Sequence, residues 1–225
     1  MKLSAQFLIP LLCANALIAD YKDDIRYNEL VAELSAIGHT LPTGTGVRVT
    51  QVEAPQTQGG TNYYPDTADS EFTGKTITDQ TGGGTTSNHA TTVGKNLYGN
   101  TTSMAPGIAD IDVYNANDWM NNLGWLNGTP PTELNPLQNH SWIGETISNN
   151  PTLRMDYAVI RDGFLPIAGL NNGSSTTVPA IYGSMYNGIT VGVSDGGHSG
   201  GGTLTDGTGR TKPEIVAPNA FTSYA

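Results

Sequence analysis

The hydrophobic and polar positions change their spacing several times along the 225-residue chain. Between Tyr27 and Gly38, apolar residues recur at the three- and four-residue spacing of one helical face, and the glycine stands where helices often end. This pattern predicts an amphipathic helix. After a Gly- and Pro-containing turn at 42–46, the β-branched run Val47–Val52 predicts a strand.

The same two patterns alternate through the rest of the chain. Small and apolar residues at helical spacing predict helices at His89–Gly99 and Leu153–Arg161. Apolar runs rich in β-branched residues predict strands at Ile108–Tyr114, Phe164–Ala168, Gly188–Val193 and Glu214–Ala217. Because helices that alternate with such strands make crossover connections, the sequence predicts an α/β fold with a largely parallel sheet.

Two stretches have little apolar periodicity and are predicted to be loops. Gly59–Ser87 is rich in Gly, Thr and Asp, which favours a long surface loop, with a disordered linker as the alternative. A second loop, with Pro130 and Pro131, leads to the short apolar stretch His140–Gly144. Ligands of parallel sheets bind beyond the carboxyl ends of the strands, so residues that follow a strand are the candidates for function.

Composition narrows the possible partners. Charged residues make up 13% of the chain, against roughly 25% in average soluble domains, and 28 glycines help to fill the difference. The formal net charge is −10, and no basic stripe is present. Nucleic acid is therefore not an expected partner, and neutral or cationic substrates are the better electrostatic match.

The first residues have the pattern of a targeting segment. Met1 and Lys2 precede the apolar run Phe7–Ala19, in which small residues lie just before Asp20. This pattern predicts a secretory signal peptide at 1–19, and thus a secreted, cell-surface or periplasmic protein with no membrane attachment after its removal. The alternatives are a buried helix, a membrane anchor, for which the run is too short, and a lipoprotein attached through Cys13.

Cysteine chemistry is excluded by position. Cys13 is the only cysteine and lies inside the predicted signal peptide. The mature chain would therefore have no disulfide, no cysteine-bound zinc and no cysteine nucleophile.

Three groups with complementary chemistry stand near strand ends or helix starts. Glu53 directly follows the first predicted strand, His89 opens a helix, and Ser223 follows the last strand after a turn. An acid, a base and a hydroxyl are the components of a nucleophilic triad, although many chains contain one of each. Of the remaining histidines, His39 is interpreted as a loop residue, His140 as a cleft neighbour and His198 as a surface residue.

The stretches around these positions resemble the subtilisin-like serine peptidases, the subtilases. "GTGVRVTQVEA" is similar to the first strand of the family, with Glu53 where the family has aspartate. "NHATTVGKNLYG" resembles the histidine block, with His89 as its first histidine and Thr92 in place of the second. Further blocks follow in the family's order, namely "SMAPGIADIDVYNA", "NHSWIGE", "DYAVIRDGFLPIAGLNNG", "YGSMYNGITVGVSD" and "GRTKPEIVAP".

The resemblance implies roles for residues in the later blocks. The backbone of "NHSWIGE" would line the substrate cleft, which assigns substrate binding to Ser141, Trp142, Ile143 and Gly144. Asn171 would be the oxyanion-hole side chain, with Asn172 as the alternative because Leu170 is an insertion relative to the family. The Asn-Asn-Gly sequence is also ordinary turn chemistry.

The nucleophile motif of the family is matched at the end of the chain. "FTSYA" stands where the family has G-T-S-M-A, which implies Ser223 as nucleophile, with Phe221 in the glycine position. A competing hydroxyl is Ser199. The family's helix after the nucleophile has no counterpart before Ala225, so we expect a subtilisin-like three-layer fold with helices on both faces of its sheet, incomplete at its C-terminus. Its catalytic domain would span 46–225, after an N-terminal helix and linker at 20–45.

The activity implied by the resemblance is that of a secreted serine endopeptidase, which hydrolyses protein or peptide substrates through an acyl-enzyme. Glu53 is longer than aspartate by one methylene, about 1.5 Å, so Asp66 and Asp69 are the alternative acids. The competing hypothesis is a non-catalytic secreted or surface binding module on the same scaffold. A more distant one is a Gly- and Thr-rich adhesin unrelated to the subtilases.

No cofactor is expected. Calcium binds to many members of the family, and carboxylates that could serve it are Asp66, Asp69, Asp110 and Asp112. Because the chain lacks a spaced loop of the D-x-D-x-D-G kind, no metal site is assigned.

Overall fold

The computed structural model describes residues 21–144, 150–174, 177–179, 181–203 and 210–218. The predicted signal peptide and Ser223 lie outside these described residues. All statements on the fold below refer to the described part of the chain.

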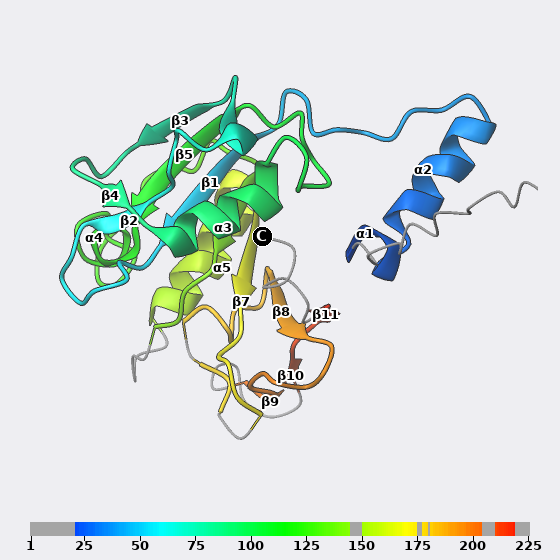
Figure 1. Cartoon of the computed structure of the whole chain (residues 1–225). Coiled ribbons are helices and arrows are strands. Elements are labelled where there is room, and N and C mark those ends of the chain that lie inside the picture. Colours follow the sequence, from blue (N-terminus) through cyan, green and yellow to red (C-terminus); the bar gives the residue numbers. More distant parts are fainter. Residues whose placement is uncertain (1–20, 145–149, 175–176, 180, 204–209, 219–225) are drawn as a thin grey trace, which may run out of the picture.

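The centre of the molecule is a parallel sheet of seven strands in the order β11-β8-β7-β6-β1-β5-β3 (Figure 1). The strands are β1 (Arg48–Glu53), β3 (Thr76–Asp79), β5 (Asp110–Asn115), β6 (Leu137–His140), β7 (Leu165–Gly169), β8 (Ile189–Val193) and β11 (Ile215–Ala217). Every pairing between neighbours is parallel. The predicted α/β fold with a largely parallel sheet is confirmed.

Strand β1 lies where the strand order reverses. The chain places β5 on one side of β1 and then crosses to β6 on the other side, from which β7, β8 and β11 continue outward. In open parallel sheets, such a reversal leaves a crevice beyond the carboxyl ends of the strands. The residues that follow β1 and β6 are therefore in the position where α/β proteins bind their ligands.

Helices cover both faces of the sheet, as the resemblance implied. Side chains alternate along β1, so Val49, Gln51 and Glu53 share one face, while Thr50 and Val52 share the other. The first face meets α3 (Asn88–Tyr98), and Val49 packs in a core with Tyr63, Phe72, Tyr98, Ile108, Ile111 and Val113. The second face meets α4 (Ala116–Asn121) and α5 (Asn150–Asp162), and Val52 packs there in a core with Trp119, Met155 and Ala158 among others.

The prediction of a loop or disordered linker at Gly59–Ser87 is wrong. This stretch forms β2 (Asn62–Tyr64), a 3₁₀ helix at Ser70–Phe72, β3 and β4 (Thr85–Thr86), and β2 pairs with β4. Two buried rings, Tyr63 and Phe72, anchor it to the core. The Asp79 carboxylate accepts the Tyr63 hydroxyl at 2.6 Å and two backbone N–H groups of the following turn. Isolated buried rings and polar hydrogen bonds order this stretch together, and neither leaves a hydrophobic period in the sequence.

Strand β6 was missed for a related reason. It reads Leu-Gln-Asn-His, which has no β-branched residue, yet Gln138 and His140 are fully buried within it. Buried polar side chains are tolerated when they are hydrogen-bonded, and His140 Nε2 lies 3.0 Å from Gln138 Oε1. Helix α4 was also not predicted, because its six residues are too few to show a helical period.

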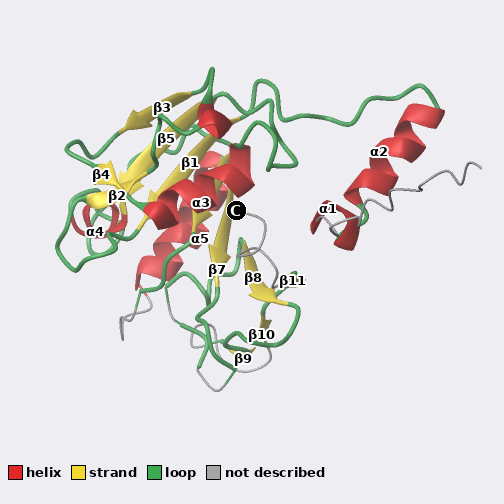
Figure 2. Ribbon diagram, in the orientation of Figure 1, coloured by secondary structure: helices red, strands yellow, loops and turns green. Residues whose placement is uncertain are grey.

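The first helices, α1 (Tyr21–Asp24) and α2 (Tyr27–Ala36), lie to one side of the sheet (Figures 1 and 2). Their contacts to the body include bonds from Lys22 Nζ to the carbonyl of Thr101 and from Tyr27 Oη to that of Met104. The helix predicted at 27–38 is present, but most of its predicted apolar face is exposed, by 44% at Leu30 and 68% at Ile37. The described residues include no helix long and apolar enough to cross a membrane.

Candidate active site

The acid of the candidate site is the last residue of β1. Glu53 shares a face with Gln51, two residues earlier on the strand, and this face looks towards α3. Its side chain is 0% exposed. A carboxylate taken out of water must find partners that repay its lost hydration, so the groups around Glu53 decide its chemistry.

The first turn of α3 holds the candidate base. Ser87 is the N-cap residue of this helix, and its Oγ accepts the backbone N–H of Ala90 at 3.1 Å. Thr91 Oγ1 donates to the Ser87 carbonyl at 2.8 Å and accepts the backbone N–H of Asp66 at 2.8 Å. These bonds fix the start of the helix against the chain before it, and His89 lies between the fixed residues.

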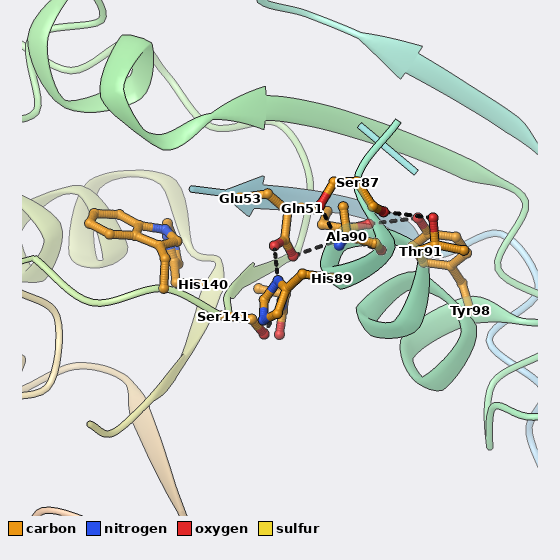
Figure 3. A network of polar contacts seen from close by, with 11 residues as sticks. Gln51, Glu53, Ser87, His89, Ala90, Thr91, Tyr98, His140 and Ser141 are labelled. Carbon is orange, nitrogen blue, oxygen red and sulfur yellow. Dashed lines mark hydrogen bonds and ion pairs between the residues drawn. The ribbon is translucent and has the colours of Figure 1, made fainter. Parts of the chain in front are cut away.

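The structure brings Glu53 and His89 into direct contact (Figure 3). His89 Nδ1 lies 2.8 Å from Glu53 Oε2. The acid is fully buried, whereas the side chain of His89 is 50% exposed, and in Figure 3 its second ring nitrogen points away from Glu53. One nitrogen of the ring is thus held by a carboxylate, while the other makes no hydrogen bond within the described part of the chain.

Each member of this pair changes the pKa of the other. Burial raises the pKa of Glu53, and the hydrogen bonds from His89 and Gln51 act against that increase. The hydrogen bond to Glu53 raises the pKa of His89, against the opposite effect of burial. A histidine with a raised pKa is a stronger base, because the carboxylate stabilises the imidazolium that forms when the ring accepts a proton.

The residues predicted to bind substrate follow β6, next to the pair. Val52 pairs with His140, so Ser141 follows at the position next to Glu53, and its Oγ accepts a hydrogen bond from Asn139 Nδ2 at 2.9 Å. Gly144 donates its N–H to the carbonyl of Ile181 at 3.3 Å. These bonds hold the segment at the end of β6, at the carboxyl edge of the sheet.

Trp142, in the same segment, joins an aromatic cluster. Its ring meets those of His140 and Tyr182 edge to face, with centroids 6.0 and 5.7 Å away. Its Nε1 donates to His140 Nδ1 at 3.3 Å. The partly buried ring of Trp142 thus connects the predicted substrate segment to the core under the sheet.

Asn171 lies two residues after β7, at the same carboxyl edge of the sheet. Its carbonyl accepts the N–H of Ser199 at 2.7 Å, and the next residue, Asn172, forms a bridge with His198. These bonds attach the Asn-Asn-Gly segment to the loop at 197–199. Ser223, the predicted nucleophile, falls outside the described residues, so its place relative to His89 remains a prediction.

Three expectations about other residues need correction. His140 is not a cleft neighbour but a core residue, and burial lowers its pKa to about 3. His198 is not a surface residue, since it is half-buried and its Nδ1 accepts the N–H of Val193 at 3.1 Å. Ser199, the competing hydroxyl, is fully buried, and thus out of reach of a substrate.

Three of the four aspartates considered for calcium bind protein groups. Asp69 caps the 3₁₀ helix and pairs with Lys95 at 2.9 Å, and Asp112 accepts from Asn135 Nδ2 at 2.7 Å and from Arg48 at 3.2 Å. Asp66 accepts the N–H of Ala68. In the described ranges, no three carboxylate, histidine or cysteine side chains gather in a way that could hold a metal ion.

Two residues of the site were missed by sequence reasoning. Gln51 donates to Glu53 Oε1 at 3.0 Å, and Tyr98 donates its hydroxyl to Gln51 Oε1 at 2.6 Å. A signal for Gln51 exists in the sequence, because residues i and i+2 of a strand share a face and a glutamine within a β-branched strand is unusual there. Tyr98 lies 47 residues away, and only the fold shows its role.

Comparison with known proteins finds similar solved structures. The chain matches neither protein-family models nor curated protein sequences. It is similar to the structure of the S41 psychrophilic protease, with a TM-score of 0.52 and 20% sequence identity over 79% of this chain and 67% of that one. It is also similar to sphericase, with a TM-score of 0.50 and 17% identity over the same shares of the two chains. Both are subtilisin-like proteases.

The chain has the subtilisin-like fold. At these identities the likeness concerns the fold, and the roles of Glu53 and His89 depend on their own geometry. The subtilisin-like sheet places the end of β1 and the start of α3 side by side, which is where the buried acid and the half-exposed ring meet.

Proposed function

We propose that this chain is a serine endopeptidase that cleaves peptide bonds through an acyl-enzyme, with Glu53, His89, Ser223 and Asn171 as its catalytic groups. The observation that carries the proposal is the 2.8 Å contact between a fully buried carboxylate and a half-exposed imidazole at the reversal point of a subtilisin-like sheet. The protease scaffold of the structural neighbours supports the same class of reaction.

In the proposed reaction, His89 removes the proton from the Ser223 hydroxyl as the oxygen attacks the substrate carbonyl. Glu53 holds Nδ1, so that the unprotonated Nε2 faces the nucleophile, and it stabilises the imidazolium that forms. His89 then gives the proton to the leaving amine, which leaves an acyl-enzyme. In the second half, His89 activates a water molecule that releases the acid product and restores Ser223.

The oxyanion formed in each half needs a hydrogen-bond donor. We assign this role to the side chain of Asn171, which follows β7 at the carboxyl edge of the sheet. One correctly placed donor of this kind stabilises the tetrahedral intermediate by about 3–4 kcal/mol. The segment Ser141–Gly144 would bind the substrate backbone, because it follows β6 at the strand end next to Glu53 and is fixed by Asn139 and Ile181.

The substrate class in this proposal is peptide or protein. With a net charge of −10, the chain attracts neutral or cationic segments more readily than acidic ones. The predicted signal peptide adds the proposal that the enzyme acts outside the cytoplasm.

The test is labelling with a fluorophosphonate probe, which reacts with activated serine hydroxyls. We expect the wild-type chain to be labelled, and Ser223→Ala and His89→Ala to lose labelling. Ser199→Ala is the matched control, since it removes the competing hydroxyl, and it should label like the wild type. Equal labelling of wild type and Ser223→Ala would exclude Ser223 as the nucleophile, and the proposal would fail with it.

A further inference from the structure

The side of Glu53 away from His89 is bound by a second buried polar group. Gln51 Nε2 donates to Glu53 Oε1 at 3.0 Å and to the backbone carbonyl of Ala90 at 3.0 Å (Figure 3). Gln51 is 0% exposed, like Glu53. The carboxylate is therefore held at both oxygens, by His89 at one and by Gln51 at the other.

The amide of Gln51 can take only one orientation. Its nitrogen faces two acceptors, Glu53 Oε1 and the Ala90 carbonyl, so a flipped amide would place its oxygen against both. Its oxygen accepts the hydroxyl of Tyr98 at 2.6 Å. Burial raises the pKa of Tyr98 well above its usual value of 10, so this hydroxyl keeps its proton as a donor. Tyr98 thus locks the orientation in which Gln51 donates to Glu53.

Helix α3 is shaped to let Tyr98 reach Gln51. Ala90, Gly94 and Tyr98 follow at four-residue spacing and form the buried side of the helix. A Cβ on Gly94 would lie 2.5 Å from Tyr98 Oη and 2.8 Å from its Cζ. The ring lies back over this glycine towards the start of the helix, so Gly94 provides the space that the hydroxyl occupies.

Glutamate needs such a partner more than aspartate would. Its longer side chain has one more rotatable bond, so a single hydrogen bond to His89 leaves its carboxylate free to rotate away. A donor on the second oxygen, fixed on the same strand two residues earlier, removes that freedom. The hydrogen bonds from Tyr98 through Gln51 to Glu53 therefore fix the orientation of this carboxylate. The bond from His89 to Glu53 fixes the orientation of the ring in the same way.

We propose that Gln51, oriented by Tyr98, is the positioning residue that allows a glutamate to serve as the acid for His89. The inference rests on the proposed function only in that it assigns the acid a catalytic purpose. The series of hydrogen bonds from Tyr98 through Gln51 to Glu53, called the relay below, can be tested without measuring catalytic turnover.

The experiment uses the full chain with Gln51→Met, which keeps the length of the side chain but removes its donor, and with Tyr98→Phe, which removes only the hydroxyl. The first readout is the titration of His89 by NMR, together with the low-field signal of its Nδ1 proton. In both variants we expect the His89 pKa to decrease towards its ordinary value and the low-field signal to weaken. Tyr98→Phe should have the smaller effect, because Gln51 keeps its nitrogen.

The second readout is the rate of fluorophosphonate labelling, which we expect to be about tenfold slower in Gln51→Met. This loss is a part of the rate enhancement that a positioned general base provides. The matched control is Tyr63→Phe. It removes another buried tyrosine hydroxyl from the same core, one that donates to Asp79. It should lower stability and leave both the His89 titration and the labelling rate unchanged.

The outcomes separate the relay from the proposed function. A shifted His89 titration in Gln51→Met supports the relay even if no variant is labelled, in which case the peptidase proposal alone fails. If Tyr98→Phe and Gln51→Met both fold and titrate like the wild type, the relay is wrong, even where labelling shows an active serine. If Gln51→Met does not fold, Tyr98→Phe decides by the same titration.

Discussion

Two arrangements of histidine, glutamine and glutamate can be compared within the described residues, and the first has the properties of a reactive site. In the first, His89 contacts Glu53 directly, and Gln51 binds the far side of the acid. In the second, Gln138 stands between the histidine and the acid. His140 Nε2 lies 3.0 Å from Gln138 Oε1, and Gln138 Nε2 lies 2.5 Å from Glu133 Oε2.

The order of the groups reverses the effect on the ring. A carboxylate in contact with His89 raises its pKa, whereas a neutral amide offers no charge to His140, so burial lowers its pKa to about 3. His89 is half-exposed and can take up a proton, while His140 lies in the core and stays neutral. The comparison teaches that residue types do not make a site. Contact with the charge and access to solvent do.

The largest effect is expected from Glu53→Gln, which keeps the shape of the side chain but removes its charge. We expect the rate of serine labelling to decrease by about 10⁴-fold, as for other triads that lose their carboxylate. The control is Glu133→Gln, the same change at the half-buried acid of the second arrangement, which should leave the rate within a factor of a few. Similar losses in both variants would contradict the distinction between the two arrangements.

The same variant changes the response to pH. Because Glu53 raises the folded-state pKa of His89, the pair stabilises the fold below the ordinary histidine value of about 6.5, and this contribution is lost as the pH rises through the raised value. The reaction needs the neutral ring, so labelling should increase across that same raised pKa. In Glu53→Gln, the NMR titration of His89 should move to lower pH.

The second arrangement should determine stability in acid. Folded His140 stays neutral down to about pH 3, whereas the unfolded chain binds a proton below about pH 6.5. Stability should therefore fall as the pH drops from about 6.5 towards 3, by up to about 5 kcal/mol from this residue. In His140→Phe, the free energy of unfolding, measured with urea at several pH values, should depend less steeply on pH. This holds whatever the change in packing does to stability at pH 7.5. An unchanged pH dependence would mean that the ring of His140 is already protonated in the folded protein over this pH range.

A smaller loss of stability is expected from Glu133→Ala. Its carboxylate accepts hydrogen bonds from the side chains of Gln138 and Thr50 and from the N–H of Asn135. A buried donor left without its acceptor costs about 1–3 kcal/mol, so the urea midpoint should decrease. The titration of His89, on the other side of the sheet, should not change. A shift there would show that the two arrangements are coupled.

The smallest effect is expected from Gly94→Ala. The new Cβ would meet the Tyr98 hydroxyl at 2.5 Å, so the ring must shift and its bond to Gln51 must lengthen. We expect labelling to slow by less than in Gln51→Met, with a small decrease in the His89 pKa. A variant identical to the wild type in both measurements would show that the position of Tyr98 does not affect the acid. Gly83→Ala, at a turn with free space around it, is unsuitable as a control because its φ is positive.

Much of the architecture could be predicted from residue patterns. The strand expected at 47–52 is β1, and the helix expected at 89–99 is α3, each within one residue at its ends. Both bury apolar or small side chains at a regular period. The stretch at 59–87 and strand β6 could not be predicted, because they are held by polar bonds such as those of Asp79 and Gln138. A sequence pattern does not distinguish a polar residue that is exposed to solvent from one that is buried and hydrogen-bonded to a partner.

By itself, the sequence determined the parallel α/β fold and the order of its blocks, since these follow from periodicity and from short motifs whose residues are neighbours in the chain. It named Glu53 and His89 as candidates, but their contact spans 36 residues and was decided by the packing of α3 against the face of β1. The tertiary structure alone placed Tyr98 and Gln51 behind the acid and placed His140 in the core. The physical reason is that pKa and reactivity depend on distance and hydration, which become fixed only when separate segments pack together.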